Sequence, residues 1–182
     1  MGALVDRLAA AEIGGTTNFY RDGERAALCR ARLADYLERR RDAPLLLVGE
    51  APGYRGARVS GIPFTSERQL TGTGPAEATA TIVHRVLAEL GLTEHVLLWN
   101  VVPTHPGTST SNRAPTAAEV AGGLPFAREL AHGRRIVAIG RVAARALDAP
   151  YVRHPSRGGL AEFRAGLLPF SAGGRGVRLS FA

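Results

Sequence analysis

The stretch Leu45-Leu46-Leu47-Val48-Gly49-Glu50-Ala51-Pro52-Gly53 joins an unbroken apolar run to a turn of small residues. The run from Leu45 to Val48 is typical of a strand that is buried on both faces of a parallel sheet. The small residues after it let a ligand approach the backbone, and they display a single carboxylate, Glu50. This stretch therefore predicts a buried parallel strand whose carboxyl end leads into a candidate site.

Apolar runs and helical segments alternate along the rest of the chain. Further strands are predicted at residues 96–99, 136–139 and 151–154. Helices are predicted at residues 24–41, 76–90, 116–130 and 141–147, the third opened by a capping box of Thr116 and Glu119. This order predicts a three-layer α/β/α fold with a doubly wound, mainly parallel four-stranded sheet. We expect residues 1–182 to form a single domain, with a loop-like stretch at residues 171–176.

The composition is that of a folded, soluble chain. Hydrophobic residues make up 45% of the 182 residues and charged residues 21%, which excludes a disordered chain. No run approaches the roughly 18 apolar residues of a membrane span, and the charged start at residues 1–7 does not resemble a secretory signal. A cytoplasmic protein without membrane contact is therefore expected. The single cysteine, Cys29, cannot by itself hold a metal, so no metal site is expected.

The positive charge is concentrated near the end of the sequence. All 23 basic residues are arginine, and the formal net charge is +7. Residues 134–182 carry nine arginines against Asp148 and Glu162, whereas the arginines and acidic residues before them balance. A one-sided positive surface attracts polyanions such as nucleic acid, although a solvated basic face without a partner would have the same composition.

Three polar side chains lie at the C-terminal ends of predicted strands: Glu50, Asn100 and His154. Ligands of doubly wound folds bind beyond the carboxyl ends of the strands, so these side chains should converge on one crevice. Each also has an ordinary structural explanation: an ion-paired glutamate, a turn asparagine or a buried core histidine. Nucleotide binding is disfavoured, because residues 49–53 lack the end of a phosphate loop and residues 72–77 lack the third glycine of a dinucleotide fingerprint.

Several short motifs in this order resemble those of the uracil-DNA glycosylase superfamily. The first motif is similar to that of the bacterial and archaeal class that carries a Gly-Glu-Ala-Pro-Gly sequence. The resemblance covers about residues 45–159. The matching motifs are Gly49-Glu50-Ala51-Pro52-Gly53, Gly61-Ile62-Pro63-Phe64, Asn100-Val101-Val102, Asn112-Arg113-Ala114-Pro115 with Glu119, Pro125-Phe126, and His154-Pro155-Ser156.

The resemblance implies roles for the residues of the site. Glu50 corresponds to the residue that orients water and faces the developing sugar cation, and His154 to the histidine that hydrogen-bonds the leaving base. Uracil would stack on Phe64 and lie against the first motif at Gly49 and Ala51. Asn100 can accept from uracil N3–H and donate to O4, whereas cytosine reverses both polarities, so this residue would reject cytosine.

A second group of residues is implied in DNA binding. Pro155, Ser156 and Arg157 resemble the loop that enters the minor groove and fills the space of the extruded base. Arg113 and Arg58 are further candidates for contacts with the DNA backbone. A plain surface turn and solvated arginines are the alternatives.

The chain departs from the family pattern in three places. The class with this first motif usually holds an iron-sulfur cluster on four cysteines, but Cys29 stands alone and Gly123 occupies one cysteine position, so no cluster and no cofactor are expected. Tyr54 and the residues after it replace acidic residues of that class; Tyr54 could exclude the thymine methyl group or point to solvent. Asn112 stands where one subgroup has a histidine that links to DNA, so turnover through water is expected, with His105 as the other candidate for covalent chemistry.

The function expected from these motifs is a monofunctional, monomeric glycosylase that releases free uracil from double- or single-stranded DNA and leaves an abasic site. The chain contains no lysine for a lyase step. One alternative keeps the pocket but changes the base to hypoxanthine, xanthine or mismatched thymine. Another is a DNA-binding or damage-sensing module that has lost catalysis.

Overall fold

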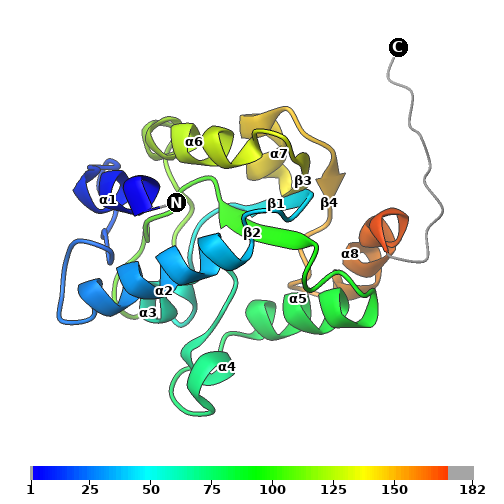
Figure 1. Cartoon of the computed structure of the whole chain (residues 1–182), viewed down its shortest axis with the longest axis horizontal. Helices are drawn as coiled ribbons and strands as arrows, with labels where there is room; N and C mark the ends of the chain where they lie inside the picture. Colours follow the sequence, from blue (N-terminus) through cyan, green and yellow to red (C-terminus); the bar gives the residue numbers. More distant parts are fainter. Residues whose placement is uncertain (1, 172–182) are drawn as a thin grey trace.

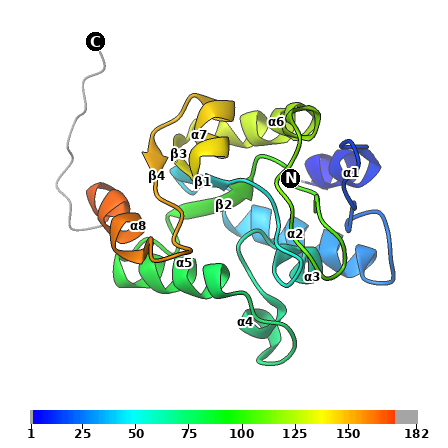
Figure 2. The same ribbon diagram turned by 180° about the vertical axis from the view of Figure 1, so that it is seen from behind.

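The computed structural model describes residues 2–171. Its sheet has four strands in the order β2-β1-β3-β4, and every pairing is parallel. Figures 1 and 2 show α6 and α7 on one face of the sheet and α2 and α5 on the other. The predicted three-layer, doubly wound fold is confirmed. The elements are α1 (Gly2–Ala10), α2 (Ala26–Arg39), β1 (Leu45–Gly49), α3 (Ala57–Ser60), α4 (Glu67–Thr71), α5 (Ala78–Glu89), β2 (Val96–Asn100), α6 (Ala117–Ala131), β3 (Arg135–Ile139), α7 (Arg141–Leu147), β4 (Tyr151–Val152), α8 (Leu160–Leu167) and the 3-10 helix η1 (Leu168–Phe170).

The two central strands explain why the apolar runs are continuous. All residues of β1 and β2 are buried, because helices cover both faces of the sheet. Their register pairs Leu45 with Val96 and Gly49 with Asn100, so the two strands end side by side. The first motif and Asn100 are thereby placed at the same edge of the sheet.

The last predicted strand is shorter than expected. Residues 151–154 were predicted to be extended, but β4 ends at Val152, and Arg153 and His154 lie in the loop beyond it. Pro155 cannot donate a hydrogen bond to a sheet, and β4 pairs only with β3 at the edge. The shorter strand releases His154 from the sheet.

The patterns of the sequence predicted four of the helices but not the others. The predicted helices at residues 24–41, 76–90, 116–130 and 141–147 correspond to α2, α5, α6 and α7. The predicted capping box of α6 is confirmed: Glu119 N–H donates to Thr116 Oγ1 over 3.2 Å, and Thr116 N–H donates to Glu119 Oε2 over 2.8 Å. The helices α1, α3, α4 and α8 were not predicted, because segments of four to nine residues carry little periodic signal. The equally short α7 was predicted from its alanine content and from the turn at Gly140 before it.

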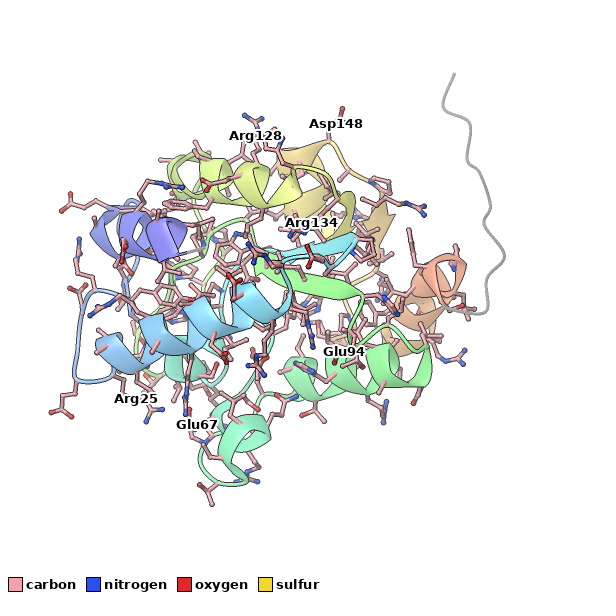
Figure 3. The ribbon with its side chains drawn as sticks, viewed as in Figure 1. Arg25, Glu67, Glu94, Arg128, Arg134 and Asp148 are labelled. Atoms are coloured by element: carbon pink, nitrogen blue, oxygen red, sulfur yellow. The ribbon has the colours of Figure 1, made fainter. Side chains whose placement is uncertain are left out.

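An ion-pair cluster fixes α4 against α2. Glu67, the first residue of α4, accepts hydrogen bonds from Arg32, and its Oε2 lies 2.8 Å from Arg25 Nη2; Figure 3 labels Glu67 and Arg25. Hydrogen bonding to Arg32 is the main cause that lowers the pKa of Glu67. These contacts anchor the segment that connects the first motif to α5. Most of the loop-like stretch predicted at residues 171–176 lies outside the described residues.

Candidate active site

A cleft of about 730 Å³ lies beyond the carboxyl ends of the strands. Glu50 lines it directly after β1, Asn100 at the end of β2, and His154 two residues after β4. The structure therefore brings together the three side chains that the sequence places after different strands. Their convergence follows from the parallel sheet, since all its strands end at the same edge.

The other predicted site residues fall into two groups. Five of them line the cleft, and a sixth, Gly49, lies directly beneath the side chains of Phe64 and Asn100, which line it. Three predicted residues, by contrast, are not among those that line the cleft. The five lining residues are Ala51, Phe64, Arg113, Ser156 and Arg157; the three outside are Tyr54, Arg58 and Pro155.

The floor of the cleft depends on the absence of a side chain at Gly49. A methyl group added there would overlap the Phe64 ring and lie 3.1 Å from Asn100 Oδ1. The aromatic ring and the amide therefore meet over the same backbone position. This arrangement offers an aromatic face and a hydrogen-bonding edge to one planar ligand.

Phe64 is held in an unusual backbone conformation. Its φ angle is +53°, which non-glycine residues rarely adopt and which costs conformational energy. Hydrogen bonds fix the loop around it: Ser60 Oγ donates to the Thr65 carbonyl over 2.6 Å, and Tyr20 Oη donates to the Gly61 carbonyl over 3.0 Å. The surrounding structure thus orients the ring toward the cleft.

Asn100 is a buried asparagine whose side-chain amide is free. The residue is only 2% exposed, and no hydrogen bond to its side chain occurs within residues 2–171. Its amide atoms are not among the fully enclosed unpaired side-chain atoms, which within the described residues are Arg58 Nε and Trp99 Nε1, so the amide is open to the cleft. A ligand in the cleft can supply the missing acceptor and donor.

Glu50 presents a carboxylate in a partly desolvated position. Burial raises its pKa above the ordinary value of a glutamate. The Glu50 carbonyl accepts a hydrogen bond from Val102 N–H over 3.0 Å, which continues the β1–β2 ladder past the strand ends. The motif loop is therefore fixed by its backbone, and the side chain is left to face the cleft.

The hydrogen bonds of His154 define which ring nitrogen carries the proton. The backbone N–H of Ser156 donates to His154 Nδ1 over 3.2 Å, and Ser156 Oγ lies 2.8 Å from the same nitrogen. Since Nδ1 accepts, the proton of the neutral ring is on Nε2. Burial lowers the pKa of His154, which favours this neutral form. The ring thus offers an Nε2–H donor to the cleft.

The segment at residues 112–119 supports the first motif from the side. Asn112 Oδ1 accepts from Tyr54 N–H over 2.9 Å. Arg113 donates to both oxygens of Glu119, over 2.8 and 2.6 Å, and this hydrogen bonding lowers the pKa of Glu119 to about 2. The guanidinium of Arg113 is therefore engaged within the protein, although it borders the cleft.

His105 is part of the framework. It is fully buried, Nδ1 lies 2.8 Å from the Pro52 carbonyl, and Nε2 lies 2.8 Å from the Thr108 carbonyl. The ring connects the first motif to the following loop. Because both nitrogens are engaged and the ring does not line the cleft, His105 is not placed to attack a substrate.

The sequence model of the Uracil DNA glycosylase superfamily matches residues 37–172, which include every element that forms the cleft. This match extends over most of the chain. The chain belongs to the uracil DNA glycosylase superfamily. Its activity is that of a DNA glycosylase, which hydrolyses an N-glycosidic bond, and DNA is its substrate. No curated protein matches the chain significantly.

The crystal structure of wild-type Pedobacter heparinus SMUG2 has the same fold. It superposes with a TM-score of 0.62 at 12% sequence identity, over 92% of this chain and 94% of that chain. At this identity the similarity concerns the fold alone. The glycosylase fold here includes α1, α3, α4 and α8, which sequence periodicity did not reveal.

Three charged residues of the glycosylase cleft were missed by sequence reasoning. Arg141 and Arg153 line it, and Arg141 follows β3 directly at the start of α7. Both arginines belong to the basic stretch at residues 134–182, and this was the feature of the sequence that could have indicated a position in the cleft. Glu77, which precedes α5, lines the cleft as a second carboxylate. In the sequence it occupies the position of the third glycine that residues 72–77 lack for a dinucleotide fingerprint, which gives no indication of a role in the cleft.

No cluster of three or more potential metal ligands occurs within residues 2–171. Cys29 is fully buried, and its thiol lies 3.8 Å from the Val59 carbonyl, so this residue is part of the protein core. The absence of an iron-sulfur cluster stays a prediction. Among the described helices, none is both long and apolar enough to cross a membrane.

Replacing Gly49 with alanine is expected to lower glycosylase activity at least about tenfold, because the added methyl group displaces the Phe64 ring. Overpacking of this kind also costs about 1–3 kcal/mol of stability. Single-turnover rates and thermal unfolding would be measured together. Gly122→Ala is the control, since a methyl group there would lie 3.4 Å from Ile13 Cγ2, an ordinary contact. Wild-type activity of Gly49→Ala would contradict the role assigned to this glycine.

Proposed function

We propose that this glycosylase is a monofunctional uracil-DNA glycosylase, which extrudes uracil from DNA, releases the free base and leaves an abasic site. The observation that carries the proposal is Asn100, a 2% exposed residue whose amide lines the cleft without a hydrogen-bond partner in residues 2–171 and meets the Phe64 ring over Gly49. An amide beside an aromatic face suits a flat base with one donor and one acceptor on the same edge.

Asn100 provides selection against cytosine. Its Oδ1 accepts from uracil N3–H and its Nδ2 donates to O4. In this amide orientation cytosine, which accepts at N3 and donates from N4, would leave both groups unpaired; a rotated amide would pair with cytosine, so the selection requires that the orientation is kept. Phe64 stacks on the ring, and the backbone at Gly49 and Ala51 borders it. A base within a duplex cannot reach this position, so the nucleotide must rotate out of the helix.

The reaction breaks the bond between uracil N1 and C1′ of the sugar, and the bonding electron pair leaves with the base. His154 donates from Nε2–H to uracil O2 and stabilises the negative charge that develops there. Water adds to C1′ and loses a proton, while the departing uracil anion takes one up. The Glu50 carboxylate faces the developing sugar cation and orients the water.

Arginines around the cleft bind the DNA backbone. Arg141, Arg153 and Arg157 border the same opening, where they can neutralise phosphates. Arg157 has a φ angle of +53° and follows Pro155 and Ser156, which form the proposed minor-groove loop. Arg113 and Arg58 are kept as weaker candidates, since Arg113 pairs with Glu119 and Arg58 lies outside the cleft lining.

The test is single-turnover incubation with labelled oligonucleotides that contain one uracil, in single strands and opposite guanine or adenine. EDTA is present, and alkali then cleaves abasic sites. Parallel substrates contain hypoxanthine, xanthine or mismatched thymine. The expected result is alkali-dependent cleavage at uracil, with no strand break before alkali and no adduct that survives denaturation.

The panel distinguishes the alternatives. Cleavage at hypoxanthine, xanthine or thymine without cleavage at uracil would reassign the base. DNA binding without cleavage at any base would favour a silent binding module. A requirement for added metal or iron-sulfur reconstitution would contradict the proposed absence of a cofactor. We further propose that the enzyme acts as a monomer in the cytoplasm, which light scattering and fractionation would test.

The pH dependence of the reaction should report Glu50. Because burial raises its pKa, the carboxylate forms at a higher pH than that of an ordinary glutamate, and the rate should rise with pH through this raised pKa. Glu50→Gln, which keeps the shape but not the charge, should remove this acid limb and lower the plateau rate about 10- to 100-fold. An unchanged acid limb in the variant would assign it to another group.

Arg157→Ala should weaken DNA binding and reduce its salt dependence. Each phosphate contact contributes about 0.9 to the slope of log K against log salt on duplex DNA, so the slope should fall by about one. Titrations at several salt concentrations measure this directly. Arg128→Ala, on α6 away from the cleft lining, is the control with an unchanged slope. An unchanged slope for Arg157→Ala would make Arg157 a solvated surface residue.

A further inference from the structure

Glu77 occupies space in the cleft that side chains at the end of the first motif, and just after it, would otherwise fill. Methyl groups added at Gly53 and Gly56 would lie 2.9 and 2.8 Å from Glu77 Cδ and would overlap its oxygens. The carboxylate therefore lies against both glycines, at the position where their side chains would project. A residue from the start of α5 thus completes a wall that the motif loop leaves open.

The local fold does not explain why a glutamate stands at this position. Glu77 is the N-cap residue of α5, but its side chain makes no capping hydrogen bond. No ion pair or hydrogen bond to its carboxylate occurs within the described residues, and burial raises its pKa. A desolvated carboxylate without a partner costs stability, which is typical of residues retained for a functional site.

The proposed orientation of uracil leaves one edge of the base unassigned. Asn100 contacts N3 and O4, His154 contacts O2, Phe64 covers a ring face, and N1 carries the sugar. The remaining edge is C5–C6, and C5 lies across the ring from C2, away from His154. Tyr54, the residue expected from sequence to face C5, does not line the cleft, whereas Glu77 does.

We infer that Glu77 closes the base pocket at uracil C5 and excludes the 5-methyl group of thymine. This inference rests on the proposed function and deepens it. A carboxylate oxygen accommodates the weakly polar C5–H as a close C–H···O contact. A methyl group at C5 would overlap the carboxylate or separate it from the remaining water, so thymine is rejected both by size and by desolvation.

The test compares the 5-substituent preference of Glu77 variants in single-turnover assays. The substrates carry uracil, 5-fluorouracil, 5-bromouracil or thymine opposite guanine, and each rate is divided by the uracil rate of the same enzyme. Glu77→Ala should raise the thymine-to-uracil ratio by about 10- to 200-fold, the range that one methyl group provides in a closed pocket. Glu77→Asp, with a shorter side chain, should give a smaller increase for thymine and 5-bromouracil.

Two matched variants separate a wall from other roles. Glu77→Gln fills the same volume and should keep thymine exclusion, and Tyr54→Ala should leave the ratio unchanged. The inference is overturned if Glu77→Ala excises uracil with an unchanged thymine-to-uracil ratio. It is also overturned if Glu77→Gln loses uracil excision as severely as Glu77→Ala, because the charge would then be required for the chemistry. A shift of the ratio in Tyr54→Ala alone would assign exclusion to Tyr54 and overturn the inference.

Failure of the proposed function gives a different result. Wild-type enzyme that does not excise uracil would refute the function itself, whereas uracil excision with unaltered selectivity in the variants refutes only the role of Glu77. Thermal unfolding checks that each variant is folded. If Glu77→Ala does not fold, Glu77→Asp and the wild-type enzyme still provide the test. The inference would be overturned if the wild-type enzyme excised 5-bromouracil and thymine as fast as uracil.

Discussion

Replacing His154 with alanine is expected to reduce the single-turnover rate of uracil excision by about 100- to 1,000-fold, with DNA binding retained. This is the typical cost of removing one preorganised donor from a developing negative charge. The donor is the Nε2–H of a neutral ring, because Ser156 N–H occupies Nδ1 and burial lowers the pKa of His154. The interaction strengthens as charge moves onto uracil O2, so the loss falls on the chemical step.

Ser156→Ala is the matched control for this prediction. It removes the hydroxyl that lies 2.8 Å from His154 Nδ1 but keeps the backbone N–H that donates to the same nitrogen. The ring orientation should be largely retained, and the rate should fall by less than about tenfold. Equal losses in the two variants would show that the hydroxyl fixes the ring. A His154→Ala rate near that of the wild type would remove His154 from leaving-group stabilisation.

Asn100→Asp is expected to lower uracil excision by about 100- to 1,000-fold and to make cytosine excision detectable. An ionised carboxylate accepts a hydrogen bond but cannot donate one, so it is repelled by uracil O4 and can accept from the N4 amino group of cytosine. The hydrogen bond lost at O4, together with the repulsion between O4 and the carboxylate, accounts for about 3–4 kcal/mol, which corresponds to this range of rates. Single-turnover rates on uracil and cytosine substrates measure both effects.

The cleft contains a suitable control for the same chemical change. Asn112 also borders the cleft, but its Oδ1 already accepts from Tyr54 N–H, and an aspartate can make the same contact. Asn112→Asp should therefore keep its base preference and most of its uracil activity. If Asn100→Asp retained wild-type rates and selectivity, Asn100 would be excluded from base recognition.

The sequence predicted those features of the fold that are caused by residues close together in the chain. Buried parallel strands must be continuously apolar, so Leu45–Val48 and the run that follows α5 located the sheet and predicted its strand type. A capping box is a contact over three residues, so Thr116 and Glu119 located the start of α6. The ends of these strands also placed Glu50 and Asn100, because parallel strands share an edge.

Other features depended on contacts between residues distant in the sequence. The carboxylate of Glu77 lies against Gly53 and Gly56, which precede it by more than twenty residues, on the far side of the segment that contains α4. Nothing in residues 72–77 signals this position. Tyr54 illustrates the reverse: its place in the motif suggested a pocket residue, but the turn of the loop leaves it outside the cleft lining.

The sequence by itself determined the layered α/β fold, the motifs and the residues that end the strands. The tertiary structure alone decided which of these side chains share a cleft, the proton position on His154 and the opening of the Asn100 amide to the cleft. The physical reason is the distance along the chain between the residues that interact. Hydrophobic periodicity and capping are set within a few residues, whereas burial, desolvation and hydrogen-bond satisfaction at the site are set by segments such as the first motif and α5, which meet only after the chain has folded.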